Sequence, residues 1–270
     1  MADGGLPADG PAQVGPVRLP AGRRITGQGR PVVWATDEPV PGAGLAWSAL
    51  AGVHPQTHLV PILLSGLQGQ PSRPWDDGEF LPPADITELD RMDAAGVLAS
   101  GWADSMPGEE EQEDEDTQAW FAAALAPYGI RFPGLAPACS EQLDTARVRD
   151  TLAALEPARV GLVDAGRPAD VLALIGWGGA VNRYQTPLPI AAVLRSWEAR
   201  FAARLLEVGF ADIRLLVERP PASTAAAQAV AAEHYALGDE CGGHTGQALT
   251  TIAEIAPALI NAPIWSFWWD

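Results

Sequence analysis

Residues 265–270 read WSFWWD, and the alternation within these six positions predicts a β-strand with two different faces. Successive side chains of a strand point to opposite sides of the sheet. One face therefore carries Trp265, Phe267 and Trp269, and the other carries Ser266, Trp268 and Asp270. We expect the first face to be buried, because burial removes three large aromatic side chains from water.

The second face leaves two alternatives for Trp268 and Asp270. If this side of the sheet is open, Trp268 beside a carboxylate is a contact platform for a partner. If a helix covers it, the strand is central and Trp268 belongs to the core. We favour the core alternative, because large apolar side chains are mostly buried.

A long helix is expected to provide the surface on which the aromatic face packs. Thr186-Pro187 begins this helix, and Gly209 stands where a helix-ending glycine belongs. Its apolar residues recur at spacings of three and four and form one stripe: Ile190, Leu194, Trp197, Phe201, Leu205 and Val208. Glu198 lies beside the stripe, and we expect it to share a structural or interface role with Trp197 and Phe201.

The remaining patterns predict an α+β fold of mixed α/β layers. The C-terminal part follows a β-α-α-β-α-α-β order, and VVWAT (32–36) opens a smaller N-terminal β-α-β module. We expect four segments: a disordered N-terminus at 1–30, the N-terminal module at 31–103, an acidic linker at 104–116 and a C-terminal α+β domain at 117–270. The first is Gly- and Pro-rich, and the linker carries like charges that repel one another.

Charge limits the classes of partner. The chain has 34 acidic residues, 17 basic residues and a net charge of -17. Residues 76–116 hold many of the acids and a single arginine, Arg91. We therefore expect no nucleic acid and no membrane among the partners, and instead a protein with a basic surface. Every basic residue is arginine, which excludes Schiff-base chemistry and a P-loop lysine.

The two cysteines, Cys139 and Cys241, are too few for a disulfide framework, and we expect reduced thiols and a cytoplasmic protein. The first residues lack the basic and apolar regions of a signal peptide. The longest apolar runs are too short to span a bilayer.

The densest group of reactive side chains is Glu233, His234, Cys241 and His244. Cys241 and His244 could bind zinc with His234 as a third ligand. Alternatively, Glu233 and His234 could be an acid/base pair beside a Cys241 nucleophile. The third interpretation is structural, with a helix end followed by a solvated loop. We favour the third, and we expect no metal and no cofactor.

Four motifs together resemble a bacterial domain-of-unknown-function family numbered 4253. They are LRSWEARFAARLLEVGF (194–210), PP (220–221), AAEHYA (231–236) and the terminal WSFWWD. The resemblance covers about residues 168–270. The upstream segments PVVWATDEPVPGAGLAWSAL and RPWDDGEF are similar to the front halves of longer actinobacterial members. The resemblance implies no activity and no catalytic residues.

These observations favour a non-catalytic cytoplasmic protein-interaction module, of the immunity type that neutralises a basic partner. The alternative is a hydrolase-type enzyme or metal site built around Glu233, His234, Cys241 and His244. The sequence leaves the oligomeric state open.

Overall fold

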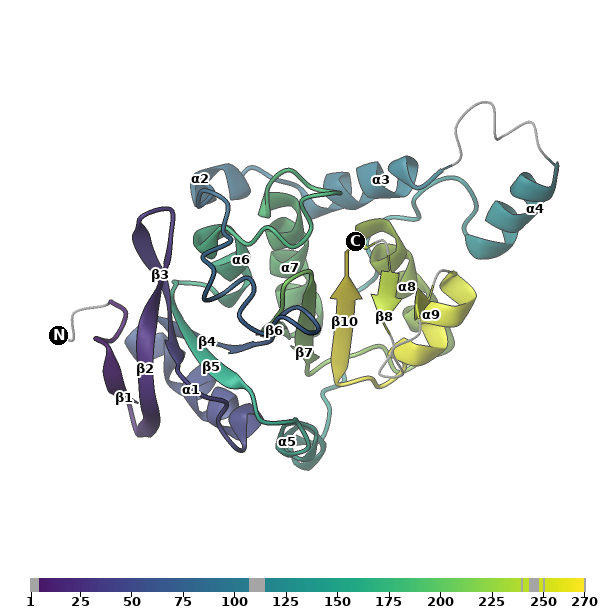
Figure 1. The fold of residues 1–270 in the computed structure, drawn as a ribbon. Helices are drawn as coiled ribbons and strands as arrows, with labels where there is room; N and C mark the ends of the chain where they lie inside the picture. The colour runs from purple at the N-terminus through teal and green to yellow at the C-terminus, as the bar shows by residue number, and fades with distance from the viewer. Residues whose placement is uncertain (1–4, 107–114, 239, 243–247, 250, 270) are drawn as a thin grey trace.

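The computed structural model describes residues 5–106, 115–238, 240–242, 248–249 and 251–269, and their strands join in one sheet (Figure 1). In spatial order the strands are β1 (Gly10–Val14), β2 (Val17–Gly27), β3 (Arg30–Thr36), β5 (Arg159–Asp164), β4 (Leu59–Leu64), β6 (Ala203–Val208), β7 (Asp212–Val217), β10 (Ile264–Trp268), β8 (Glu240–Gly242) and β9 (Ala248–Leu249). Neighbours pair antiparallel, except that β4 and β6 run parallel. The predicted α+β class is confirmed.

Helices cover both faces of the sheet. On one face, α1 (Ala43–Thr57) and α5 (Thr145–Ala153) bury Trp47, Leu50 and Leu152 against the strands. The core on the other face includes residues of α3 (Ala94–Asp104), α6 (Val171–Ile175), α7 (Leu188–Phe201), α8 (Thr224–Leu237) and α9 (Ile252–Leu259). The short α2 (Ile86–Leu89) lies against α7. None of the described helices combines the length and the apolar composition of a membrane span.

The predicted disorder of residues 1–30 is wrong for residues 10–27, which form the β1–β2 hairpin. Buried residues recur at every second position in β1 and at every second or third position in β2, with exposed residues between them. Glycine here permits close packing rather than disorder. A Cβ on Gly22 would lie 2.4 Å from the carbonyl oxygen of Ala35, so only glycine fits against β3.

Residues 31–103 do not form a sheet of their own. β5 lies between β3 and β4, and β4 also pairs with β6, so the upstream and downstream parts share one sheet. Of the predicted acidic linker at 104–116, residues 107–114 lie outside the described residues. Glu115 and Asp116 begin α4 (Glu115–Ala124), which lies at the edge of the molecule (Figure 1).

The long helix ends earlier than the sequence predicts. α7 stops at Phe201, and Ala202 adopts a left-handed φ of 49° while its N–H binds the Trp197 carbonyl. Leu205 and Val208, predicted on the helical stripe, lie on β6 instead. Both faces of β6 are covered, and apolar residues therefore occur on both faces instead of alternating with polar ones. Their positions happen to agree with the spacing of three and four residues that is typical of a helix. The C-terminal order therefore contains a β6–β7 hairpin where one helix and one strand were expected.

Candidate functional site

Glu233 is a fully buried carboxylate of α8, and its hydrogen-bond partners Ala136, Trp197 and Arg200 are groups that hold the fold together. Oε1 accepts hydrogen bonds from the Ala136 amide at 2.6 Å and from Arg200 Nη1 at 2.6 Å. Oε2 accepts from Trp197 Nε1 at 2.7 Å and from Arg200 Nη2 at 2.6 Å. Arg200 also donates to the Ala136 carbonyl at 2.8 Å. Glu233 thus ties α7, α8 and the irregular segment at Ala136 together, and its lone pairs are occupied.

His234 is the second residue of the predicted catalytic pair, and it lies inside the aromatic core. Its ring centroid is 4.6 Å from Phe267, 4.7 Å from Trp265 and 5.1 Å from Trp197. Nε2 is buried and has no hydrogen-bond partner among the residues that the structure describes, and burial lowers the pKa of His234 to about 3. The imidazole is therefore neutral at pH 7. Because the ring is 1% exposed, substrate cannot reach it without moving the core.

Cys241 and His244 complete the group that the sequence singled out. Cys241 lies on β8, where its backbone pairs with Phe267 of β10. The side chain of Cys241 and the whole of His244 lie outside the described residues, as do Asp239 and Asp270. Within the residues that the structure describes, no three His, Cys, Asp or Glu side chains gather as metal ligands. The structure therefore brings Glu233 and His234 together only as parts of the core.

The aromatic row of β10 is buried against α7, as its alternation predicts. Phe267 stacks on Trp197 with centroids 5.2 Å apart, and Trp265 meets Phe201 at 5.4 Å. Trp269 meets Trp177 at 5.6 Å. Each of these side chains is almost completely buried. Glu198, next to Trp197, turns away from this core and binds Arg167 at 2.6 Å.

The core prediction for Trp268 is wrong, because this side chain is 40% exposed on the opposite face of β10. The core beneath α1 and α5 includes Ile264, at the other end of the same strand, but not Trp268. In the β10–β7 register Trp268 lies opposite Asp212. Burial and the charge of Glu207 raise the Asp212 pKa to about 6.

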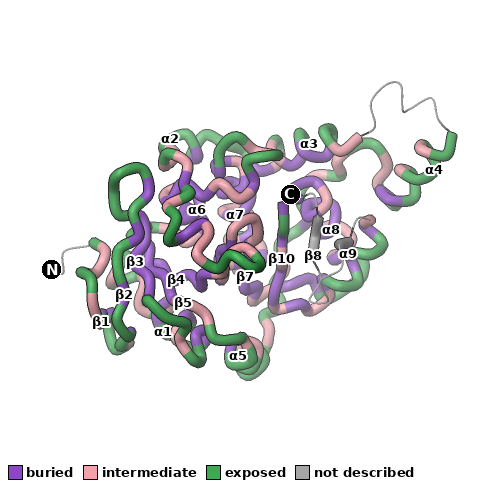
Figure 2. Tube along the Cα trace, viewed as in Figure 1, coloured by how far each residue is buried: buried purple, intermediate pink, exposed green. Residues whose placement is uncertain are grey.

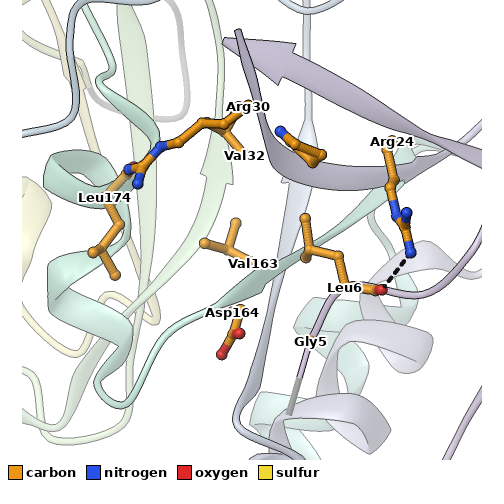
Figure 3. Close-up of a pocket in the computed structure, with 9 residues that line it drawn as sticks. Gly5, Leu6, Arg24, Arg30, Val32, Val163, Asp164 and Leu174 are labelled. Carbon is orange, nitrogen blue, oxygen red and sulfur yellow. Dashed lines mark hydrogen bonds between the residues drawn. The ribbon is translucent and has the colours of Figure 1, made fainter. Parts of the chain in front are cut away.

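One hollow of about 470 Å³ lies between β3, β5 and α6 (Figure 3). Arg24 and Arg30 flank it, with Asp164 at the same opening. Arg24 donates to the carbonyls of Pro7 and Leu6, and Arg30 donates to Leu174. With both guanidinium groups bound to the chain and a carboxylate beside them, this hollow presents no clear charge for a ligand.

A stronger candidate is one side of the molecule, along which α2, α3 and α4 lie in sequence (Figure 1). The acidic residues of these helices and their caps are all exposed, and we call them the acidic side: Asp85, Glu88, Asp90, Asp93, Asp104, Glu115 and Asp116. Only Asp90 among them has an arginine in ion-pair contact within the described residues, Arg195 at 2.5 Å.

Arginine does not balance this charge at the surface, because most arginines are bound elsewhere in the fold. Arg195 also holds Asp170 at 2.5 Å, and these two carboxylates raise its pKa above the usual range. Arg200 holds Glu233, and Arg204 holds Glu218. None of the arginines is buried, but most bind groups outside the acidic side, which in the described part of the chain has only Arg91 and the shared Arg195 to offset its seven carboxylates and therefore keeps a negative field.

α4 adds apolar surface to the acidic side. Of its ten residues only Ala124 is buried, and most of the helix is coloured as exposed (Figure 2). Trp120 is 51% exposed. Beside the helix lies a hollow of about 460 Å³, lined among others by Met106, Phe121, Leu125 and Ile130. The sequence offers a partial signal for this exposure. Trp120 and Phe121 are adjacent and point about 100° apart around a helix, so on a helix at the edge of the molecule one can pack while the other is exposed.

Comparison with known proteins agrees with the resemblance stated above. Residues 159–270 match the family described as a domain of unknown function, DUF4253. The matched domain begins at β5 and contains Trp197, Arg200, Glu233, His234 and the β10 strand. α2, α3 and α4 lie outside it. No curated protein and no solved structure matches the chain.

Proposed function

We propose that this protein is a non-catalytic interaction module that binds a protein partner with a basic surface. The observation that carries the proposal is the acidic side, where seven exposed carboxylates lie along α2, α3 and α4 while Arg200, Arg204 and other arginines pair with carboxylates elsewhere on the protein. Such a field steers a basic partner and repels nucleic acid and anionic membrane.

The chemistry of the core supports the same proposal. Glu233 and His234 are the residues that a hydrolase would have used, and both serve packing and hydrogen bonding instead. A role of the immunity type, in which an acidic protein neutralises a basic one, is consistent with the acidic side and with the structural roles of Glu233 and His234. We further propose that the protein acts in the cytoplasm without a cofactor.

The proposal is tested with two variants of equal net charge. The first neutralises the acidic side through Glu88→Gln, Asp104→Asn, Glu115→Gln and Asp116→Asn. The second neutralises four exposed acids elsewhere through Glu38→Gln, Glu141→Gln, Asp150→Asn and Glu156→Gln. Each is used, with the wild type, to capture partners from the native host at low salt, and the captured protein is identified and rebound as a purified component.

We expect the wild type and the second variant to retain one stoichiometric basic partner that salt releases, and the first variant to lose it. Equal retention by both variants would show that the acidic side is not the binding surface. Recovery of the wild type alone at low salt would contradict the proposed function as a whole.

A further inference from the structure

The most unusual element of the described chain is α4, because its largest apolar side chain, Trp120, is half exposed although Phe121 and Ala124 pack against the core. Between Glu115 and Ala124 the sequence offers Trp120 and Phe121, yet Trp120 is half exposed and touches Phe121 edge-on at 4.8 Å. In a water-soluble helix such residues normally form the stripe that faces the core. Here a large part of that apolar surface remains available to a partner.

The hollow of about 460 Å³ beside α4 is large enough to take inserted side chains. Phe121 and Leu125 line it from the helical side, and Met106 and Ile130 line it from the flanking chain. Ile130 is 77% exposed, the highest value among the large apolar side chains outside the core. A partner that covers Ile130 and Trp120 would remove both from water, which is the energetic basis of a binding hot spot.

Carboxylates stand next to this apolar surface. Asp104 ends α3, and Glu115 and Asp116 form the first turn of α4; all three are exposed. No ion pair to any of the three exists within the described residues. A surface that combines an apolar hollow with acids at one end is complementary to a chain that combines apolar and cationic side chains.

We infer that α4 and its hollow bind a basic amphipathic helix, with apolar side chains in the hollow and Lys or Arg side chains over Asp104, Glu115 and Asp116. The inference rests on the proposed function and names the part of the partner that is recognised. Helix-in-groove binding uses apolar anchors at helical spacing, and the exposed Trp120 and the hollow beside α4 offer apolar surface for such anchors. A second copy of this chain is disfavoured as the occupant, because two chains of net charge -17 repel each other.

The probe is a fluorescein-labelled synthetic peptide with leucine at helical spacing and lysine at the other positions. Two further peptides serve as controls, one with each leucine replaced by serine and one with each lysine replaced by glutamate. Binding to the full chain is measured by fluorescence anisotropy at low and at raised salt. The protein variants are Trp120→Ser and Ile130→Ser, with Trp268→Ser as the matched control because Trp268 is similarly exposed on a different part of the surface.

We expect the leucine–lysine peptide to bind the wild type in a salt-dependent manner and to bind Trp120→Ser and Ile130→Ser about tenfold or more weakly. Trp268→Ser should bind like the wild type, and the glutamate peptide should not bind. Amides of α4 should exchange more slowly in the complex. All four proteins should keep the same melting temperature, because the three substituted side chains are exposed.

Three results would overturn the inference while leaving the proposed function in place. They are unchanged binding to Trp120→Ser and Ile130→Ser, equal binding of the serine–lysine peptide, and a wild-type dimer that Trp120→Ser dissociates. The last result would assign the apolar surface to a second copy. Failure of every lysine-containing peptide to bind the wild type at low salt would instead contradict the proposed function itself.

Discussion

The substitution Glu233→Gln tests whether the Glu233 carboxylate has a structural role in the core. Each carboxylate oxygen of Glu233 accepts two hydrogen bonds, one from Arg200 and one from either Ala136 or Trp197. Glutamine keeps one acceptor oxygen and turns an NH₂ group toward the other two donors. It also removes the charge that balances Arg200, whose side chain is only 14% exposed.

The loss in the free energy of unfolding can be estimated from these unpaired donors and from the broken ion pair. A buried donor left without an acceptor costs about 1–3 kcal/mol, so two such donors cost about 2–6 kcal/mol. Measured losses for breaking one side of a buried ion pair are about 3–5 kcal/mol, which falls within the same range. We therefore expect Glu233→Gln to lower the free energy of unfolding by about 3–5 kcal/mol, a large part of the total for a typical domain.

Urea unfolding followed by tryptophan fluorescence and by circular dichroism measures this change. Glu198→Gln is the matched control, because Glu198 also pairs with an arginine at 2.6 Å but in a partly exposed site. Its loss should be about 0–1 kcal/mol. If the unfolding midpoint of Glu233→Gln equals that of Glu198→Gln, the structural interpretation of Glu233 is wrong.

Three further predictions concern His234, Asp212 and the terminal strand. Because burial lowers the folded-state pKa of His234 to about 3, the wild type should lose stability relative to His234→Leu by about 1.4 kcal/mol per pH unit as pH falls from 6.5 toward 3, in urea titrations at each pH. Because the Asp212 pKa is raised to about 6, its protonated form is favoured in the fold, and stability is lost as pH rises from 3.8 to 6. Asp212→Asn should therefore exceed the wild type by about 1–3 kcal/mol at pH 7 and match it below pH 3.8. Trp265→Ala should cost about 3–5 kcal/mol, and deletion of residues 265–270 should lower the melting temperature; an unchanged melting temperature would contradict the packing described for β10.

Elements with a regular apolar pattern were predictable from the sequence. In β10 and β7 the apolar residues of one face alternate with polar residues over most of the strand, although Ile264 and Leu216 are buried on the opposite face. α7 begins directly after Pro187, as predicted. β6 was not predictable in the same way. Its residues are buried on both faces, so Leu205 and Val208 satisfied the helical spacing equally well, and only pairing with β7 decides the conformation.

Other features depend on contacts between distant segments. Whether Trp268 is covered depends on how far α1 and α5 extend over the sheet, and no local pattern encodes that extent. The role of Glu233 is likewise not encoded in a local pattern. Its partner Arg200 lies 33 residues away in the sequence, and its partner Ala136 lies 97 residues away. Glu233 and His234 suggested chemistry because they are adjacent in sequence, whereas their partners come from other elements.

The division of roles along the chain follows from the same contacts. Within the matched domain, the polar and aromatic residues that suggested a site make contacts with one another. Trp197 stacks on Phe267 and donates a hydrogen bond to Glu233, and Arg200 forms an ion pair with that carboxylate. A domain whose most reactive side chains hold its core together needs other residues for recognition. The apolar and acidic surface around α4 lies upstream of residues 159–270. Binding by this chain is therefore expected to depend on its upstream part, with the matched domain acting as the scaffold that presents it.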